Sequence, residues 1–167
     1  MLQAQPRLHE WRPLLPALRQ IVDRGSLVLI GAPHLPNLAA LVSAGLRAEQ
    51  ILRIDAPTPA QRLWAAEQVL RCQELGALLA WLPQARSEQL RRLQLASTST
   101  QALVFAFRPE QARHESSPAP LRLGLRVAPE DNALSVELLK RRGPHIDHPV
   151  TLTASLVQLH FPMFQGS

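Results

Sequence analysis

Two histidines and one aspartate stand close together in His145-Ile146-Asp147-His148. Imidazole and carboxylate groups bind transition metals, so this cluster could hold a metal ion if a distant residue supplied further ligands. Pro144 and Pro149 flank the cluster and predict an exposed loop, and the sequence contains no second cluster of such ligands. We therefore predict a solvated loop here and no bound metal.

The other candidates for catalysis are isolated side chains. Asp55 and His34 each follow an apolar run, where a lone polar residue more often caps a turn or a helix than performs chemistry. Ser116 and Ser117 lie in a proline-containing polar stretch without the G-x-S-x-G turn that exposes a nucleophile. Cys72, the single cysteine, falls in a predicted helix, which favours inert packing over a reactive thiol. The sequence thus predicts no catalytic residue.

Nucleotide binding by α/β proteins commonly depends on a glycine-rich loop, and this sequence lacks both usual forms of that loop. Neither G-x-x-x-x-G-K-[ST] nor G-x-G-x-x-G occurs, and the single lysine, Lys140, stands late in the chain. The apolar runs "LVLIGAP" and "ALLAWLP" end without the carboxylate that would bind magnesium. We therefore predict neither a cofactor nor an enzyme activity.

The composition indicates one globular domain. Of the 167 residues, 46% are hydrophobic and 19% are charged, which suffices for an apolar core. The sequence has no apolar run long enough to span a membrane and no pattern of a secretory signal, so we expect a cytoplasmic protein. The net charge is +5, and all cationic residues except Lys140 are arginines, which suit phosphates and acidic protein surfaces.

The spacing of apolar residues predicts an α/β fold. Continuous apolar runs alternate with segments of helical spacing, as in a mostly parallel sheet with helices on both faces. The expected strands cover 26–33, 50–55, 77–83 and 102–109, and the expected helices cover 10–24, 38–44, 58–75 and 87–95. Antiparallel strands are expected on the C-terminal side, over 121–127, 133–140 and 150–156. We expect a flexible N-terminus over 1–9, one domain over 10–156 and a tail over 157–167.

Two runs of basic residues are candidates for contact with a partner. Lys140-Arg141-Arg142 ends the last well-patterned strand, and it is either a solvated strand end or a contact with DNA phosphate or with an acidic protein face. Arg91 and Arg92 stand between two leucines that are expected to face inward, so we place them on the exposed face of their helix. There they are either solvated or part of an interface, where arginine is enriched.

The large apolar residues of the predicted elements are assigned from their positions. Trp64 lies on the long helix and Trp81 ends an apolar run, so we expect both in the core. Leu95 is expected to face inward from the helix over 87–95, and Trp11 could be exposed near the N-terminus. With 4% aromatic residues and no tyrosine, a base-stacking platform for single-stranded nucleic acid is not expected.

Several segments resemble one known family. "LVLIGAPHLP", "AGLRAEQILRID" and the helix and apolar run that follow resemble the central part of the RecA fold. "LRRLQLAS", "ALVFAFRP", "SPAPLRLGLRV" and "LLKRRG", in this order, resemble the catalytically inactive ImuA/SulA branch of that superfamily, and ImuA most closely. The resemblance covers most of the chain, from about residue 10 to residue 143.

This resemblance implies a protein that binds partners and has no active site. ImuA-like proteins are SOS-response accessory proteins of translesion DNA synthesis, which act with an ImuB-like protein, a DnaE-type polymerase and RecA. SulA-like proteins instead bind the tubulin-like protein FtsZ and inhibit cell division. The sequence departs from active RecA proteins at "GAPHLP", where the catalytic glutamate is missing, and at "ALLAWLP", which lacks the acidic magnesium ligand. We expect an ImuA-like adaptor, with a SulA-like division inhibitor as the alternative, and either could touch DNA weakly.

Overall fold

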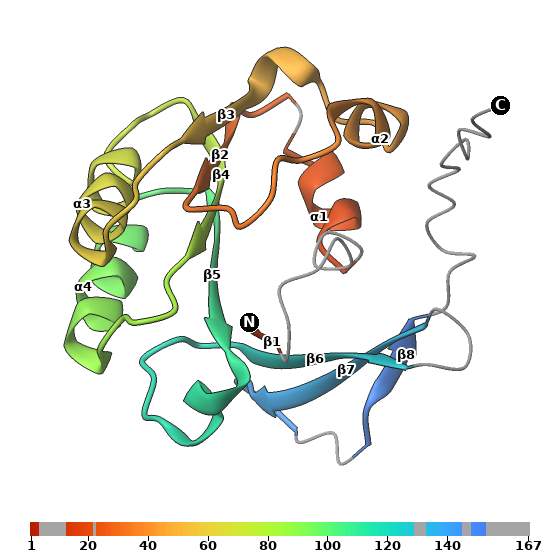
Figure 1. The fold of residues 1–167 in the computed structure, drawn as a ribbon, viewed down its shortest axis with the longest axis vertical. Coiled ribbons are helices and arrows are strands. Elements are labelled where there is room, and N and C mark those ends of the chain that lie inside the picture. The colour runs from red at the N-terminus through yellow and green to blue at the C-terminus, as the bar shows by residue number, and fades with distance from the viewer. Residues whose placement is uncertain (4–12, 22, 129–132, 145–147, 153–167) are drawn as a thin grey trace, which may run out of the picture.

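A single sheet connects the parallel and the antiparallel parts of the molecule (Figure 1). The computed structural model describes residues 1–3, 13–21, 23–128, 133–144 and 148–152. Eight strands are hydrogen-bonded in the order β3-β2-β4-β5-β1-β6-β7-β8. The strands are β1 (Leu2–Gln3), β2 (Ser26–Ile30), β3 (Ile51–Ile54), β4 (Leu75–Trp81), β5 (Leu103–Pro109), β6 (Arg122–Ala128), β7 (Ala133–Lys140) and β8 (Val150–Leu152).

Helices connect the parallel strands and cover both faces of that part of the sheet (Figure 1). The described residues form the helices α1 (Leu15–Arg19), α2 (Leu38–Ser43), α3 (Pro59–Val69) and α4 (Ser87–Ser97), and the 3-10 turns η2 (Ala48–Gln50) and η3 (Glu110–His114). None of these helices is both long enough and apolar enough to cross a membrane.

Two apolar clusters hold the parallel strands and the helices together. On one face, Leu63 of α3 and Leu90 of α4 pack against Leu78 of β4. On the other face, Leu18 of α1 packs in a cluster with Leu79 of β4. Adjacent residues of β4 enter different clusters because successive side chains of a strand point to opposite faces. Burial on both faces explains the continuous apolar runs in the sequence, and the predicted α/β fold with helices on both faces is confirmed.

The first residues of the chain form a strand inside the sheet. β1 pairs in parallel with β5 and with β6, and Leu2, opposite Arg108 of β5, is buried. The Met1 amino group donates a hydrogen bond to the Ala106 carbonyl at 2.6 Å. Burial, with smaller contributions from Arg122 and Arg108, lowers the pKa of this amino group to about 5. β1 therefore joins the parallel part of the sheet to the antiparallel part.

The prediction of a flexible N-terminus is wrong for residues 1–3, while residues 4–9 lie outside the described residues. A strand of two residues carries no periodicity that a sequence pattern could reveal. It is ordered by hydrogen bonds from the strands on each side of it. The division into 10–156 and a tail over 157–167 stays a prediction.

β6, β7 and β8 form the antiparallel part, which runs across the lower side of the view in Figure 1. β6 pairs with β7 from Arg122 opposite Lys140 to Ala128 opposite Ala133. β8 pairs with the other edge of β7, with Leu152 opposite Leu134. The predicted antiparallel strands are confirmed, and residues 153–156 of the last one lie outside the described residues.

Two predicted helices are shorter in the structure. α3 ends at Val69 because a turn leads from it into β4, which already begins at Leu75. The chain closes tightly here: Ser26 donates from its backbone N–H to the Glu74 carbonyl at 2.8 Å, and Gly25 leaves no room for a Cβ atom beside that carbonyl. Of the helix predicted over 10–24, the structure forms the short helix α1, and residues 10–12 and 22 lie outside the described residues.

Candidate partner-binding surface

Arg62 fills the carboxyl ends of the parallel strands, the place where α/β proteins commonly bind ligands. Its Nε donates to the Ala56 carbonyl, just beyond β3, at 2.9 Å, and its Nη1 donates to the Trp81 carbonyl, at the end of β4, at 3.4 Å. A Cβ atom added to Gly31, which follows β2, would stand 2.6 Å from Arg62 Nε. The side chain thus contacts residues at the ends of three strands.

The isolated polar candidates do not converge on a catalytic site. Asn37, not His34, caps α2, because its Oδ1 accepts a hydrogen bond from the Ala40 N–H at 3.0 Å, so the capping prediction for His34 is wrong. Asp55 is exposed. Cys72 is also exposed, in the turn after α3, and the prediction of a packed helical cysteine is wrong.

The predicted metal cluster cannot be placed as a whole. His148 is exposed, and the other members, His145 and Asp147, lie outside the described residues. Within the part of the chain that the structure describes, no three His, Cys, Asp or Glu residues are grouped so that they could hold a metal ion.

Local signals in the sequence fix where α3 and α4 begin. Thr58 Oγ1 accepts from the Gln61 N–H at 3.2 Å, and Gln61 Oε1 accepts from the Thr58 N–H at 3.0 Å. Pro59 occupies the first position of α3, where its missing N–H is not needed. At α4 the Gln89 side chain accepts from the Arg86 N–H at 2.8 Å, so Arg86, not the predicted Ser87, is the capping position.

Trp64 lies on the outer side of α3. Its side chain is 65% exposed, so the prediction that it packs in the core is wrong. Gln68, four residues further along α3, lies on the same side of the helix and is polar. An exposed tryptophan is unusual for a monomer surface and is the residue type most enriched among the energetically important residues of interfaces.

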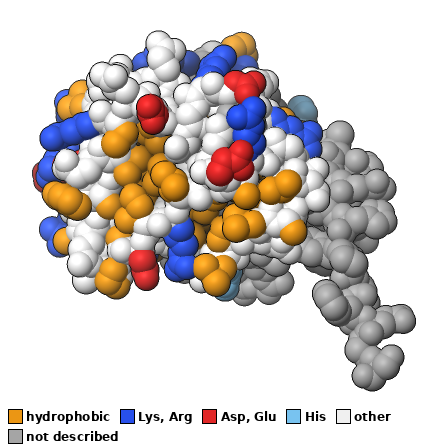
Figure 2. Space-filling view, turned by 90° about the horizontal axis from the view of Figure 1, so that it is seen from above, with side chains coloured by type: hydrophobic (Ala, Val, Ile, Leu, Met, Phe, Trp, Pro, Cys, Tyr) orange, Lys and Arg blue, Asp and Glu red, His pale blue; other side chains and the backbone are white. Residues whose placement is uncertain are grey.

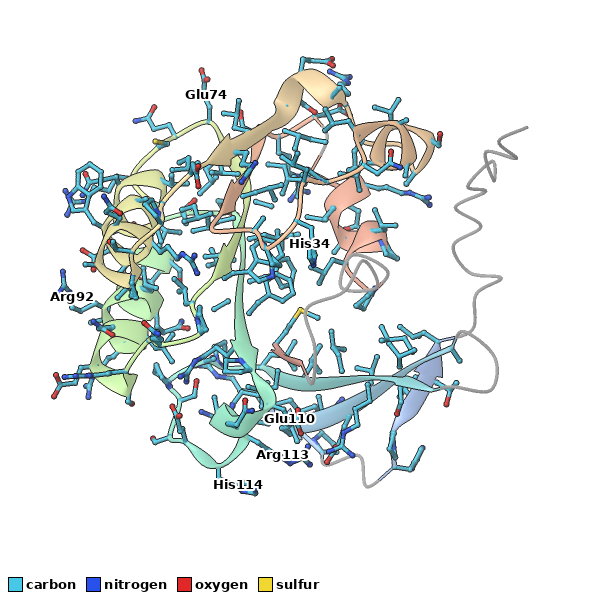
Figure 3. The ribbon with its side chains drawn as sticks, in the orientation of Figure 1. His34, Glu74, Arg92, Glu110, Arg113 and His114 are labelled. Atoms are coloured by element: carbon cyan, nitrogen blue, oxygen red, sulfur yellow. The ribbon has the colours of Figure 1, made fainter. Side chains whose placement is uncertain are left out.

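α4 presents the two predicted arginines beside a leucine. Arg92 Nη2 forms an ion pair with Glu67 Oε2 of α3 at 2.8 Å and still points outward, as Figure 3 shows. Arg91 is exposed as predicted, and no hydrogen bond or ion pair joins its side chain to another described residue. Leu95 is 63% exposed, so its predicted inward position is wrong. We call Trp64, Glu67, Arg91, Arg92 and Leu95 the α3–α4 surface.

The other predicted basic run divides into two parts. Lys140 Nζ donates to the Ser117 carbonyl at 2.9 Å, so it holds the segment between β5 and β6 against the end of β7. Arg141 and Arg142 are exposed beyond the end of β7. Figure 1 shows α4 in the helical layer and the end of β7 in the antiparallel part, so the structure does not bring the two basic runs onto one element.

An ionic network that the sequence did not suggest holds η3 to the antiparallel strands (Figure 3). Arg113 forms ion pairs with Glu110 at 3.2 Å and with Glu137 of β7, and Arg126 of β6 pairs with Glu110 at 3.1 Å. The hydrogen bond from Arg113 lowers the pKa of the Glu137 carboxyl, and the same bond raises the pKa of the Arg113 guanidinium. These groups neutralise one another, so the network stabilises the fold and is not a free anion site.

α2 and β3 also carry exposed apolar side chains, and Figure 2 shows several hydrophobic side chains on the face that it views. Leu38 and Val42 of α2 are 45% and 47% exposed, and Leu52 of β3 is 49% exposed. Among the described residues β3 is also the edge of the sheet, and no strand of this part of the chain pairs with its outer backbone groups. This area is a further surface on which a protein could pack.

The exposure of Trp64 and Leu95, which were wrongly predicted to be buried, could have been inferred from their positions in the sequence. Trp64 directly follows the inward Leu63, and a step of one residue turns the side chain by about 100° around the helix. Leu95 stands five residues after the buried Leu90, which places it about 140° away. A strict test of helical spacing would have placed both side chains outside the core.

The strand order and the helices on both faces define an α/β protein with a RecA-like fold. The structure is similar to that of the RadB recombinase, with a TM-score of 0.68 over 93% of this chain and 87% of that one, at 10% identity. It is also similar to the crystal structure of SulA from Pseudomonas aeruginosa, with a TM-score of 0.51 and 28% identity over 65% of this chain and 94% of that one. The likeness to RadB concerns the fold alone.

Sequence comparison also finds SulA proteins. The chain is 30% identical over 115 residues to the cell division inhibitor SulA of Photorhabdus laumondii, and 24% identical over 108 residues to SulA of Edwardsiella piscicida. These matches cover 68% and 64% of this chain, and the chain spans 65% and 64% of the two relatives. No protein-family model matches the chain. The relatives support the SulA side of the predicted resemblance and lend no support to a specific closeness to ImuA.

Proposed function

We propose that this protein is a non-enzymatic inhibitor of bacterial cell division, which acts in the cytoplasm during the SOS response by binding FtsZ. The observation that carries the proposal is the similarity to SulA proteins, at 30% identity in sequence and 28% in a superposed structure. It replaces the expected ImuA-like adaptor, whose partners would be an ImuB-like protein, a DnaE-type polymerase and RecA, as the leading function.

The strand ends support a binding protein over an ATP-dependent enzyme. Arg62 bonds to the carbonyl groups at the ends of β3 and β4, and the sequence holds no phosphate-binding loop. An inhibitor of this kind needs only a surface that fits its partner.

The α3–α4 surface is the proposed contact with FtsZ. Trp64 of α3 supplies a large exposed apolar side chain, and Arg91 and Arg92 supply cations on α4, which the Arg92–Glu67 pair joins to α3. Aromatic and arginine side chains together dominate the binding energy of many interfaces. Arg141 and Arg142 are proposed as secondary contacts to an acidic surface or to DNA. Lys140, whose Nζ donates a hydrogen bond to the Ser117 carbonyl, holds the end of β7 from which these two arginines follow.

The test measures assembly of purified FtsZ with GTP by sedimentation and light scattering. The chain is expected to reduce the amount of sedimented FtsZ, and Trp64→Ala should weaken this inhibition at least about tenfold. Leu35→Ala is the matched control, because Leu35 is 72% exposed but lies between β2 and α2, away from α3 and α4. Its inhibition should equal that of the wild type.

A parallel pull-down separates the two branches of the resemblance. Immobilised chain is offered FtsZ and an ImuB-like protein from the same organism, and we expect FtsZ alone to be retained. Retention of the ImuB-like protein with unchanged FtsZ assembly would favour the adaptor and refute the inhibitor. Equal inhibition by Trp64→Ala would remove the α3–α4 surface from the proposal and leave the function itself intact.

A further inference from the structure

β5 lies in the middle of the sheet, yet it is covered less completely than its neighbour β4. All seven residues of β4 are buried, whereas in β5 Phe107 is buried and the other six are half-buried. Phe107 belongs to the cluster on the side of α1 and α2. On the opposite side, a groove of about 300 Å³ lies between α4 and the segment 117–123, with Val104 and Ala106 among its lining residues.

The walls of this groove are apolar. α4 contributes Leu90 and Leu93, and the covering segment contributes Pro118 to Leu121. Leu121 is 50% exposed. The aliphatic part of a ligand in this groove would therefore be buried between the apolar side chains of α4 and those of the covering segment.

Two arginines give this groove a cationic part. Arg108 and Arg122 both line it, and the Arg108 side chain is only 9% exposed. Arg122 is engaged, because its Nη1 donates to the Glu115 carbonyl at 3.1 Å and its Nη2 donates to the Ala112 carbonyl at 3.0 Å. Because these acceptors are neutral carbonyl groups, they do not neutralise the positive charge of Arg122.

Arg108 keeps an unused recognition edge. Its Nη1 pairs with Glu115 Oε2 at 3.0 Å, but its buried Nε has no acceptor among the described residues, and the same holds for its Nη2. Nε and Nη2 form one side of the planar guanidinium, and such an edge binds a carboxylate through two parallel hydrogen bonds. A buried donor without an acceptor destabilises the protein, so an acceptor that reaches this edge gains affinity.

We propose that this groove binds a small amphipathic carboxylate, with its aliphatic chain between Leu93 and Ala119 and its carboxylate on the Nε–Nη2 edge of Arg108. A water molecule occupies about 30 Å³ in the liquid, so a groove of about 300 Å³ has room for roughly ten heavy atoms of similar size. An eight-carbon fatty acid has this size. Glu115 competes for the same guanidinium, but its side chain is 53% exposed and is held there by one contact. The site does not depend on the proposed binding of FtsZ.

The probe is octanoate, titrated into ¹⁵N-labelled full chain and followed by amide chemical shifts. Saturable shifts are expected at residues of the groove, such as Val104 and Ala106. The matched neutral probe is 1-octanol, which should bind about tenfold more weakly, because it cannot form the charge-assisted pair. Shifts that spread over the whole molecule without saturation, or equal affinity for octanol, would overturn the proposal.

Variants locate the charged contact. Arg108→Gln should weaken octanoate binding about tenfold or more, while Glu115→Gln should strengthen it, because it removes the competing carboxylate. Opposite effects at neighbouring residues distinguish binding from a general loss of structure. Arg53→Gln, on the edge strand β3 and outside the lining of the groove, is the matched control and should leave the affinity unchanged. The proposal fails if Arg108→Gln, shown to be folded, binds octanoate as the wild type does.

Discussion

The parallel and antiparallel parts of the sheet are held by different forces. Around β2, β4 and their helices, two clusters of buried apolar side chains fill both faces of the sheet. In the antiparallel part, the buried hydrophobic residues among those described are Leu125, Ala133 and Leu134. This part and η3 instead contain three of the six ion pairs of the described residues, namely Arg113–Glu110, Arg113–Glu137 and Arg126–Glu110, and a fourth, Arg108–Glu115, joins β5 to the residue after η3.

Because of this difference, the stability of the two parts should depend differently on pH and on salt concentration. Apolar burial does not depend on protonation or on ionic strength, whereas ion pairs at a surface are screened by salt and lost when a carboxylate is protonated. We therefore expect the parallel part to set the stability of the fold and the antiparallel part to respond first to pH and salt.

The largest effect is expected in the apolar core. Leu79 is 1% exposed, and Leu79→Ala should lower the free energy of unfolding by about 2–5 kcal/mol through lost burial and a cavity. Urea unfolding followed by circular dichroism measures the change. Leu121→Ala is the control, because Leu121 is 50% exposed and its loss should cost about 1 kcal/mol or less. Equal losses for the two variants would contradict the contrast between core and surface.

A smaller effect is expected where Arg62 approaches the backbone. Gly31→Ala places a Cβ atom 2.6 Å from Arg62 Nε at a residue with φ of +64°, so both a clash and backbone strain arise. We expect a loss of about 1–3 kcal/mol in the free energy of unfolding. Gly45→Ala, at φ of +91° with its nearest contact 3.6 Å from Arg19, adds strain without a clash and should lose less. The same urea titration compares them, and a larger loss at Gly45 would refute the packing of Arg62 on Gly31.

A still smaller and pH-dependent effect is expected in the ionic network. The hydrogen bond from Arg113 lowers the pKa of Glu137, so the folded protein binds this proton more weakly than the unfolded chain does. The pair therefore stabilises the fold above the ordinary carboxyl pKa, and this contribution is lost as the pH falls through the lowered pKa. Glu137→Gln should cost about 1 kcal/mol or less at neutral pH, because the pair is partly exposed.

The measurement is the difference in free energy of unfolding between wild type and Glu137→Gln at pH 7 and near pH 3, at low and high salt. The difference should shrink at the lower pH and at the higher salt. Glu88→Gln is the control, because Glu88 is exposed on α4 and pairs with no described residue. A difference that stays constant with pH would show that the ion pair does not form.

The smallest effects are expected at the basic run after β7. Lys140→Ala should lower stability by about 1 kcal/mol or less, because it removes the hydrogen bond to Ser117. Replacement of Arg141 and Arg142 by alanine should leave stability within about 0.5 kcal/mol and weaken binding to an acidic partner at low salt. Unchanged affinity at low salt would make both arginines a solvated strand end.

The sequence determined the parallel half of the fold because its elements have local signals. Buried strands such as β4 are apolar on both faces, and Thr58, Pro59 and Gln61 form the residue pattern that begins α3. The absence of a phosphate-binding loop is likewise a property of the sequence. The exposed position of Arg91 followed from helical spacing alone.

Only the tertiary structure decided the features that depend on residues far apart in the chain. β1 is a strand because two distant strands pair with it, and Lys140 is tied because Ser117 comes within 2.9 Å. Arg62 at the strand ends and Arg108 in the lining of the groove show the same dependence. A side chain's partners are fixed when the sheet assembles, and spacing along the sequence carries no record of them.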